Sequence, residues 1–155
     1  MELLAQALAG IVAGTLIAAA CAKLRHSNET RDALKDWHLP SSRAAVWWLS
    51  GVELATALLV LVVPSWGALV ATFLFGAFTV ALLIQLAKGS HAPCPCFGAT
   101  TKEVSFRTIV TNAFLLAASL FAQTAETPAR VPFARFAMTA ATMVYLLSDR
   151  RYVRV

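Results

Sequence analysis

Charged residues are scarce in this sequence. Only 14% of its 155 residues are Asp, Glu, Lys or Arg, whereas 59% are hydrophobic. Soluble domains carry about a quarter charged residues, and the mean hydropathy of +0.69 agrees with a more apolar class. The shortage of charge excludes an ordinary soluble domain. We expect one integral membrane domain over residues 1–155, with the lipid bilayer as its partner.

The sequence also lacks a basic patch of the kind that binds nucleic acid. Its net charge is +5, but the Lys and Arg residues are dispersed at the ends of apolar runs. They do not gather into a patch with interleaved aromatic residues that could form a groove. Membrane topology explains this distribution better, so we expect no nucleic-acid partner.

Five apolar runs are long enough, or nearly so, to cross a bilayer as helices, which takes about 20 residues. They predict an all-α, four-helix membrane bundle followed by a fifth, C-terminal apolar helix. The first run has no Lys or Arg before it, which disfavours a cleaved signal peptide. The fifth is short and carries Arg135 in its first turn, so it either spans with a snorkelled arginine or lies partly in the interface. The runs cover approximately residues 3–22, 44–63, 66–87, 104–122 and 132–147.

Between the first and second runs, residues 23–43 reverse this pattern with five cations, beginning at Lys23, and three acids. We expect an aqueous loop here. Within it, Ser27 or Asn28 can cap a short helix whose apolar side rests on the membrane surface. That side consists of Ala33, Leu34 and Trp37.

Small and turn-forming residues mark the neighbouring spans. Ser41 or Ser42 can cap the second span. The dipeptide 64–65 (Pro-Ser) predicts a tight turn before the third, in which Gly67 and Gly76 permit close helix contact.

Cysteine is scarce as well, and its odd count of three allows at most one intramolecular disulfide. Cys94 and Cys96 lie one residue apart in a loop of residues 88–103 that follows the third run. Prolines on both sides of Cys94 hold the pair on stiff, non-helical backbone, and a disulfide between them would be strained and exchangeable. The pair is a candidate redox centre or, with His91, a soft-metal site. Two buried, unreactive thiols are the simpler alternative.

Four other residues are candidates for the same site. Glu53 is an acid inside an apolar span, so we expect it to face the bundle interior near a polar group such as Asn112, either in catalysis or in helix packing. Asn112 itself either fixes packing or contacts a cofactor. Cys21 is either a resolving thiol or a small packing residue. Arg107 is, with Asn112, a candidate for cofactor binding; it can also snorkel to the surface, and with nearby lysines it favours the thiolate form of the pair.

The charge distribution also predicts an orientation. With five spans, eleven Lys and Arg residues fall on one side and two, Arg130 and Arg135, on the other. The positive-inside rule then places the N-terminus outside, and puts loops 23–43 and 88–103 together at the cytoplasmic face. Cys21 falls at the same depth on that face, so all three thiols can be neighbours.

Several of these elements resemble the MauE family of methylamine-utilisation membrane proteins, which group with DoxX-like four-helix membrane bundles. The resemblance covers roughly residues 10–120, and Pro95 and Thr111 depart from it where the family usually has Gly and Arg. It implies a thiol-disulfide role in maturing or supplying exported proteins, often beside a thioredoxin-like partner. The matching elements are 20–24 (Ala-Cys-Ala-Lys-Leu), 52–54 (Val-Glu-Leu), 94–98 (Cys-Pro-Cys-Phe-Gly) and Asn112 with Leu115 and Leu116.

Three classes of function are consistent with these observations. In a multi-pass protein of the bacterial inner membrane, Cys94 and Cys96 would exchange electrons with a thioredoxin-like protein or a quinone, with Glu53 as proton acceptor. A copper or mercury transporter is weaker, because the triplet lies at a span end and no nucleotide-binding domain drives a pump. A non-catalytic assembly factor for a partner enzyme is the third class.

Overall fold

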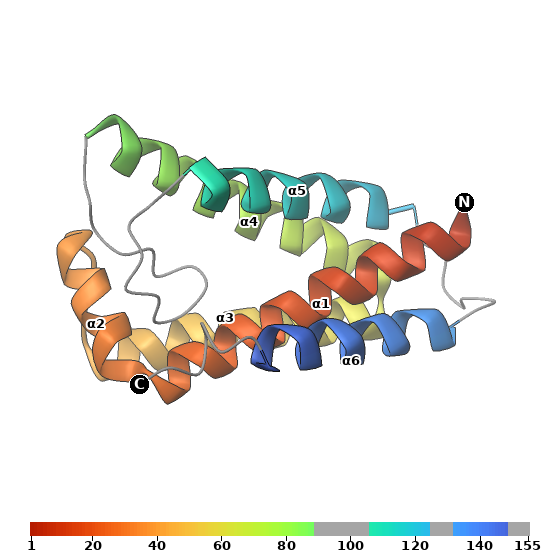
Figure 1. The fold of residues 1–155 in the computed structure, drawn as a ribbon, viewed down its shortest axis with the longest axis horizontal. Helices are drawn as coiled ribbons and strands as arrows, with labels where there is room; N and C mark the ends of the chain where they lie inside the picture. The colour runs from red at the N-terminus through yellow and green to blue at the C-terminus, as the bar shows by residue number, and fades with distance from the viewer. Residues whose placement is uncertain (89–105, 125–131, 149–155) are drawn as a thin grey trace.

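The computed structural model describes residues 1–88, 106–124 and 132–148, and in this part of the chain every regular element is an α-helix (Figure 1). Three of the helices, α1, α3 and α4, are long and apolar enough to cross a membrane, and α5 contains a shorter apolar stretch. The predicted all-α membrane bundle is therefore confirmed. The helices are α1 (Glu2–Arg25), α2 (Ser27–Asp36), α3 (Arg43–Val62), α4 (Pro64–Ala87), α5 (Phe106–Ala122) and α6 (Pro132–Ser148).

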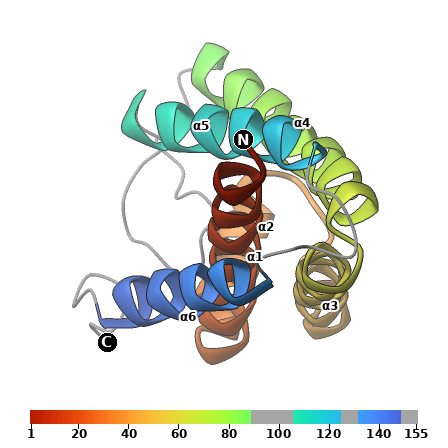
Figure 2. The ribbon, with the colours of Figure 1, turned by 90° about the vertical axis from the view of Figure 1, so that its right-hand side faces the viewer.

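Helix α1 is the centre of the bundle. Viewed end-on, it lies between the α4–α5 pair on one side and helices α3 and α6 on the other (Figure 2). Seven of its fourteen buried residues are alanine, and Val12 and Leu16 are also buried. Small side chains let neighbouring helices approach closely, which is how apolar helices gain packing energy in lipid.

Helix α6 packs directly on α1. A side chain at Gly10 would collide with the backbone oxygen of Arg135, and one at Gly14 would lie 2.8 Å from that of Thr139. Thr139 Oγ1 lies 3.1 Å from the Gly10 carbonyl oxygen. The two glycines therefore form the groove that receives α6.

The snorkelling that we predicted for the Arg135 side chain is wrong, because this residue is only 4% exposed. Its Nη1 donates a hydrogen bond of 2.9 Å to the carbonyl oxygen of Leu61, and its guanidinium lies 5.9 Å from the ring centroid of Phe136. Leu61 is in the last turn of α3, where the carbonyl oxygens find no N–H donor within the helix. Arg135 is held inside because its guanidinium supplies a hydrogen-bond donor to this carbonyl at the end of α3.

Helices α3 and α4 form a hairpin joined by Val63 alone. The third span begins at Pro64, two residues before the predicted start, because proline is tolerated at the first helical position. A side chain at Gly67 would collide with the backbone of Val60, as expected for close contact, but one at Gly76 would meet nothing within 4 Å, so the prediction for Gly76 is wrong.

The predicted short helix is present as α2, with two corrections. Its N-cap is His26, without a side-chain cap, so the capping role of Ser27 or Asn28 is wrong. Its apolar residues do share a side, but they are buried against the protein, where Trp37 packs on Leu82 of α4, and do not rest on the membrane surface. Ser42 caps α3 as predicted by accepting a hydrogen bond of 3.1 Å from the Ala45 amide.

Candidate functional site

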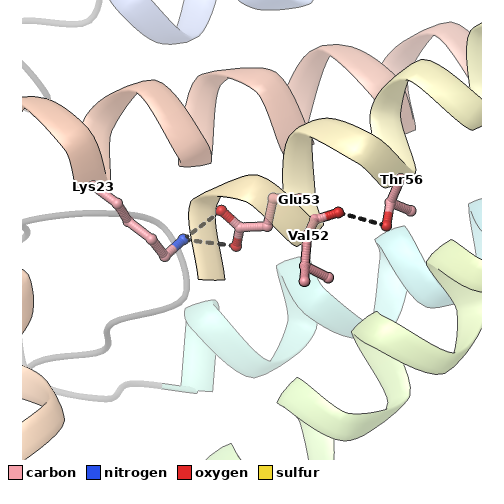
Figure 3. Close-up of polar contacts among 4 residues, drawn as sticks. All are labelled: Lys23, Val52, Glu53 and Thr56. Atoms are coloured by element: carbon pink, nitrogen blue, oxygen red, sulfur yellow. Dashed lines mark hydrogen bonds and ion pairs between the residues drawn. The ribbon is translucent and has the colours of Figure 1, made fainter. Parts of the chain in front are cut away.

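The most unusual feature of the interior is an ion pair between Lys23 of α1 and Glu53 of α3 (Figure 3). Lys23 Nζ lies 2.7 Å from one carboxylate oxygen of Glu53 and 3.0 Å from the other. Neither side chain is exposed at all. Both oxygens of one carboxylate therefore face one ammonium group inside an apolar bundle.

The structure confirms that Glu53 faces the interior but corrects its partner, which is Lys23 and not Asn112. The structure also corrects the position that we predicted for Lys23, which we placed in the aqueous loop but which is buried in α1. Helix α1 continues to Arg25, three residues past the predicted end of the span. These additional residues bring Lys23 round to the inner face of the helix, so it no longer counts among the aqueous charges of the positive-inside rule.

Glu53 belongs to a continuous inner face of α3. Its neighbours one turn away in each direction, Ser50 and Ala57, are also buried. The nearby Thr56 hydroxyl instead donates to the Val52 carbonyl within its own helix, at 2.8 Å (Figure 3). Ser50 Oγ is buried and has no hydrogen-bond partner among the described residues.

The energetics of the pair make it a candidate for function as well as for helix packing. Removing two such charges from water costs several kcal/mol per ion, and their attraction repays this only when the geometry is good. Apolar residues of similar volume often stabilise a protein as well or better. Intramembrane ionisable residues are by default candidates for function.

Asn112 connects α5 to α4. Its Nδ2 donates to the Phe75 carbonyl at 3.0 Å and to Thr79 Oγ1 at 2.6 Å, while its Oδ1 has no partner in the described part of the chain. Further along the same helices, Thr72 and Ser119 hydroxyls lie 2.9 Å apart. This geometry is typical of a residue that fixes helix packing, and the cofactor contact of Asn112 stays a prediction.

Of the three cysteines, Cys21 lies among the described residues. Cys21 lies on α1, two residues before Lys23, with a partly exposed free thiol. Cys94, Cys96 and His91 lie outside the described residues, as does the side chain of Arg107. Within the described residues, no group of three or more His, Cys, Asp and Glu side chains could hold a metal ion.

The predicted redox loop is flanked by the end of α4 and the start of α5, and both of these helix ends are described. Leu82, near the end of α4, and Ile109, near the start of α5, join Trp37 in one apolar cluster. Figure 1 shows both helix ends directed to the end of the bundle where α2 lies, which is also where α1 finishes at Arg25. Lys23 and Cys21 are close to that end.

A comparison with protein families adds the decisive observation. A family model described as "Methylamine utilisation protein MauE" matches residues 1–125. This chain belongs to the MauE family. The match includes helices α1 to α5 and therefore Lys23, Glu53, Asn112 and all three cysteines, whereas α6 lies beyond the matched MauE region. No curated protein and no solved structure matches the chain.

Sequence reasoning missed Lys23 as a site residue, although a signal was present. An acid such as Glu53 in an apolar span calls for a cation in the same bundle. Lys23 is the cation next to the first apolar run, and it lies in the first of the elements that resemble the MauE family. Extending the first predicted helix by one turn would have placed Lys23 inside the bundle, where it could pair with Glu53.

Proposed function

We propose that this MauE-family protein is a thiol-disulfide relay in the bacterial inner membrane, crossing it several times. In one half-cycle the Cys94 or Cys96 thiolate attacks a disulfide of a thioredoxin-like partner and forms a mixed disulfide. The second thiolate of the pair displaces the partner's sulfur. The relay pair is then a disulfide and the partner a dithiol, with two electrons and two protons transferred in total. A quinone is the alternative acceptor of the same electrons and protons.

The observation that carries this proposal is the buried Lys23–Glu53 pair. A dithiol must lose two protons when it is oxidised, so a base near it is useful. Glu53 supplies such a group, because its carboxylate lies 2.7 Å from Lys23 Nζ inside the bundle. The helix ends that bound residues 88–103 lie at the end of the bundle where α1 finishes, and this supports Glu53 as the proton acceptor of the relay.

The test of the relay is trapping of a mixed disulfide in native membranes. Single Cys94→Ser and Cys96→Ser variants should each retain one attacking or trapped sulfur, and one of them should accumulate a covalent adduct with a thioredoxin-like protein that is lost on reduction. The Cys94→Ser/Cys96→Ser double variant is the matched control and should give no adduct through this loop. Stoichiometric copper or mercury on a permanently reduced pair would instead favour the transporter, and full activity of the double variant would favour an assembly factor.

A second test separates the proton role of Glu53 from its structural role. The Lys23→Met/Glu53→Leu double variant removes both charges and leaves no unpaired ion, so the bundle should remain folded. We expect it to exchange disulfides at least tenfold more slowly than the wild type, with a rate that depends on added buffer bases. An unchanged rate in a folded double variant would assign the pair to packing alone.

A further inference from the structure

One buried hydroxyl of the bundle does not bond to its own helix. A serine or threonine inside a helix can donate to a carbonyl oxygen of the preceding turn, and five of the six buried ones among the described residues do so. The sixth is Ser50 of α3, which is 1% exposed and whose Oγ has no hydrogen-bond partner in the described part of the chain. The five that bond to their own helix are Thr15, Thr30, Thr56, Ser119 and Thr139.

A buried hydroxyl without a partner is costly, so the position of Ser50 needs an explanation. Its Oγ is not accessible to solvent, so the partner it lacks is a side chain already packed nearby and not a bound molecule. Glu53 lies one turn further along the same buried face. Helical side chains lean toward the N-terminus of their helix. Figure 3 shows the Glu53 carboxylate directed away from Thr56 and so toward the turn that contains Ser50.

The present partner of Glu53 suits only the ionised carboxylate. Lys23 Nζ lies 2.7 and 3.0 Å from its two oxygens, and an ammonium group donates hydrogen bonds but cannot accept one. When Glu53 takes up a proton, it gains an O–H donor, and Lys23 offers no acceptor for it. The unused oxygen of Ser50, one turn away, is such an acceptor.

We propose that Ser50 positions Glu53 during proton transfer. Lys23 holds the carboxylate, and Ser50 Oγ accepts the hydrogen bond of the carboxylic acid that forms when Glu53 takes up a proton. This inference rests on the proposed relay for the source of that proton, which is the thiol of Cys94 or Cys96. The proton moves from sulfur to a Glu53 oxygen and no electron moves. The thiolate gains the negative charge that the carboxylate loses, so the total charge is unchanged.

Lys23 is the charged group that faces Glu53 from α1, and α4 has no charged residue within its helix. Arg25, the last cation of α1, is exposed. The charged side chains of α2 are exposed or have other partners. They are Glu29, paired with His26; Asp32, paired with Lys35; Asp36, which is exposed; and Arg31, which donates to the Ser41 carbonyl oxygen.

Infrared difference spectroscopy of the purified full chain tests this pairing without the relay. Acidification should produce the carbonyl band of a protonated Glu53 while circular dichroism shows that the protein is still folded. The Lys23→Met/Glu53→Leu variant has no carboxyl group at this position, so it should lack the band and thereby assign it. In Ser50→Ala the acid loses its acceptor, and the band should shift to higher frequency. Thr56→Val is the matched control, because this hydroxyl is also three residues from Glu53 but bonds to the Val52 carbonyl; its band should not shift.

Stability and rate separate positioning from packing. Ser50→Ala should melt at no lower temperature than the wild type, because it removes a buried hydroxyl that has no partner among the described residues. In native membranes its disulfide exchange should be about fivefold slower, the fold-change equivalent to the roughly 1 kcal/mol of one hydrogen bond, whereas Thr56→Val should exchange at the wild-type rate.

Three results would overturn the proposal: an unshifted band in Ser50→Ala, no Glu53 band in the folded protein, or a wild-type exchange rate in Ser50→Ala. Failure of the relay itself has a different signature. The Cys94→Ser/Cys96→Ser variant would then keep full activity, while the band shift in Ser50→Ala would still support Ser50 as the partner of the protonated Glu53.

Discussion

At the scale of single residues, the Lys23–Glu53 pair makes a stability prediction that is independent of any activity. Replacing one partner, as in Lys23→Met or Glu53→Leu, leaves a charge buried without its counter-ion. Each single variant should lose about 3–5 kcal/mol of unfolding free energy, because breaking a buried pair costs this much. Thermal unfolding of the detergent-purified protein, followed by circular dichroism, measures the loss.

The double variant is the control for that measurement. Lys23→Met/Glu53→Leu should be closer to the wild type than either single variant, so the coupling energy between the two sites should be large. Additive losses would contradict the direct pairing of the two side chains inside the bundle.

Asn112 should behave differently, although it is equally buried. An Asn112→Leu change removes two hydrogen bonds to α4, but it leaves no charge behind, and it also removes an amide oxygen that has no partner among the described residues. Side-chain hydrogen bonds between membrane helices contribute on average about 0.6 kcal/mol. We expect a loss of about 1 kcal/mol in the same thermal unfolding assay, and a loss above roughly 3 kcal/mol would point to a further role for the amide.

At the scale of helices, the contact between α1 and α6 depends on the absence of side chains. Gly14→Leu would force a side chain against the backbone of Thr139, and such overpacking typically costs about 1–3 kcal/mol. Gly76→Leu is the matched control, because a side chain there meets nothing within 4 Å. The control should be neutral or slightly stabilising, since glycine is a poor helix former. Equal melting temperatures for the two variants would show that α6 does not depend on this groove.

The helices themselves were predictable because bilayer thickness sets the length of an apolar run, and the predicted ranges agree with α1, α3 and α4 to within about three residues. Two interior cations were not predictable from the same pattern. Lys23 and Arg135 both lie at the ends of apolar runs, where a cation ordinarily reaches water. Their partners are thirty and seventy-four residues away, and only the packing of α1, α3 and α6 brings those partners close.

At the scale of the whole molecule, α6 is part of the bundle although it lies outside the region that matches the MauE family. Deleting residues 126–155 would uncover Gly10 and Gly14 on the central helix and remove the Arg135 hydrogen bond to α3. We expect the shortened protein to melt at least 5 °C lower and to aggregate on size-exclusion chromatography. Unchanged behaviour would mean that the matched helices form a self-sufficient unit.

The hairpin of α3 and α4 and the ion pair together have a consequence for how the chain enters the membrane during synthesis. Lys23 is made thirty residues before Glu53, so this ammonium cannot meet its carboxylate when α1 first reaches the bilayer. An unneutralised lysine is costly in hydrocarbon, and the last turn of α1 therefore waits at the water boundary. Because only Val63 separates α3 from α4, we expect these two helices to insert as one unit and to bring Glu53 with them. The burial of the last turn of α1 would then be completed by the arrival of α3 and α4.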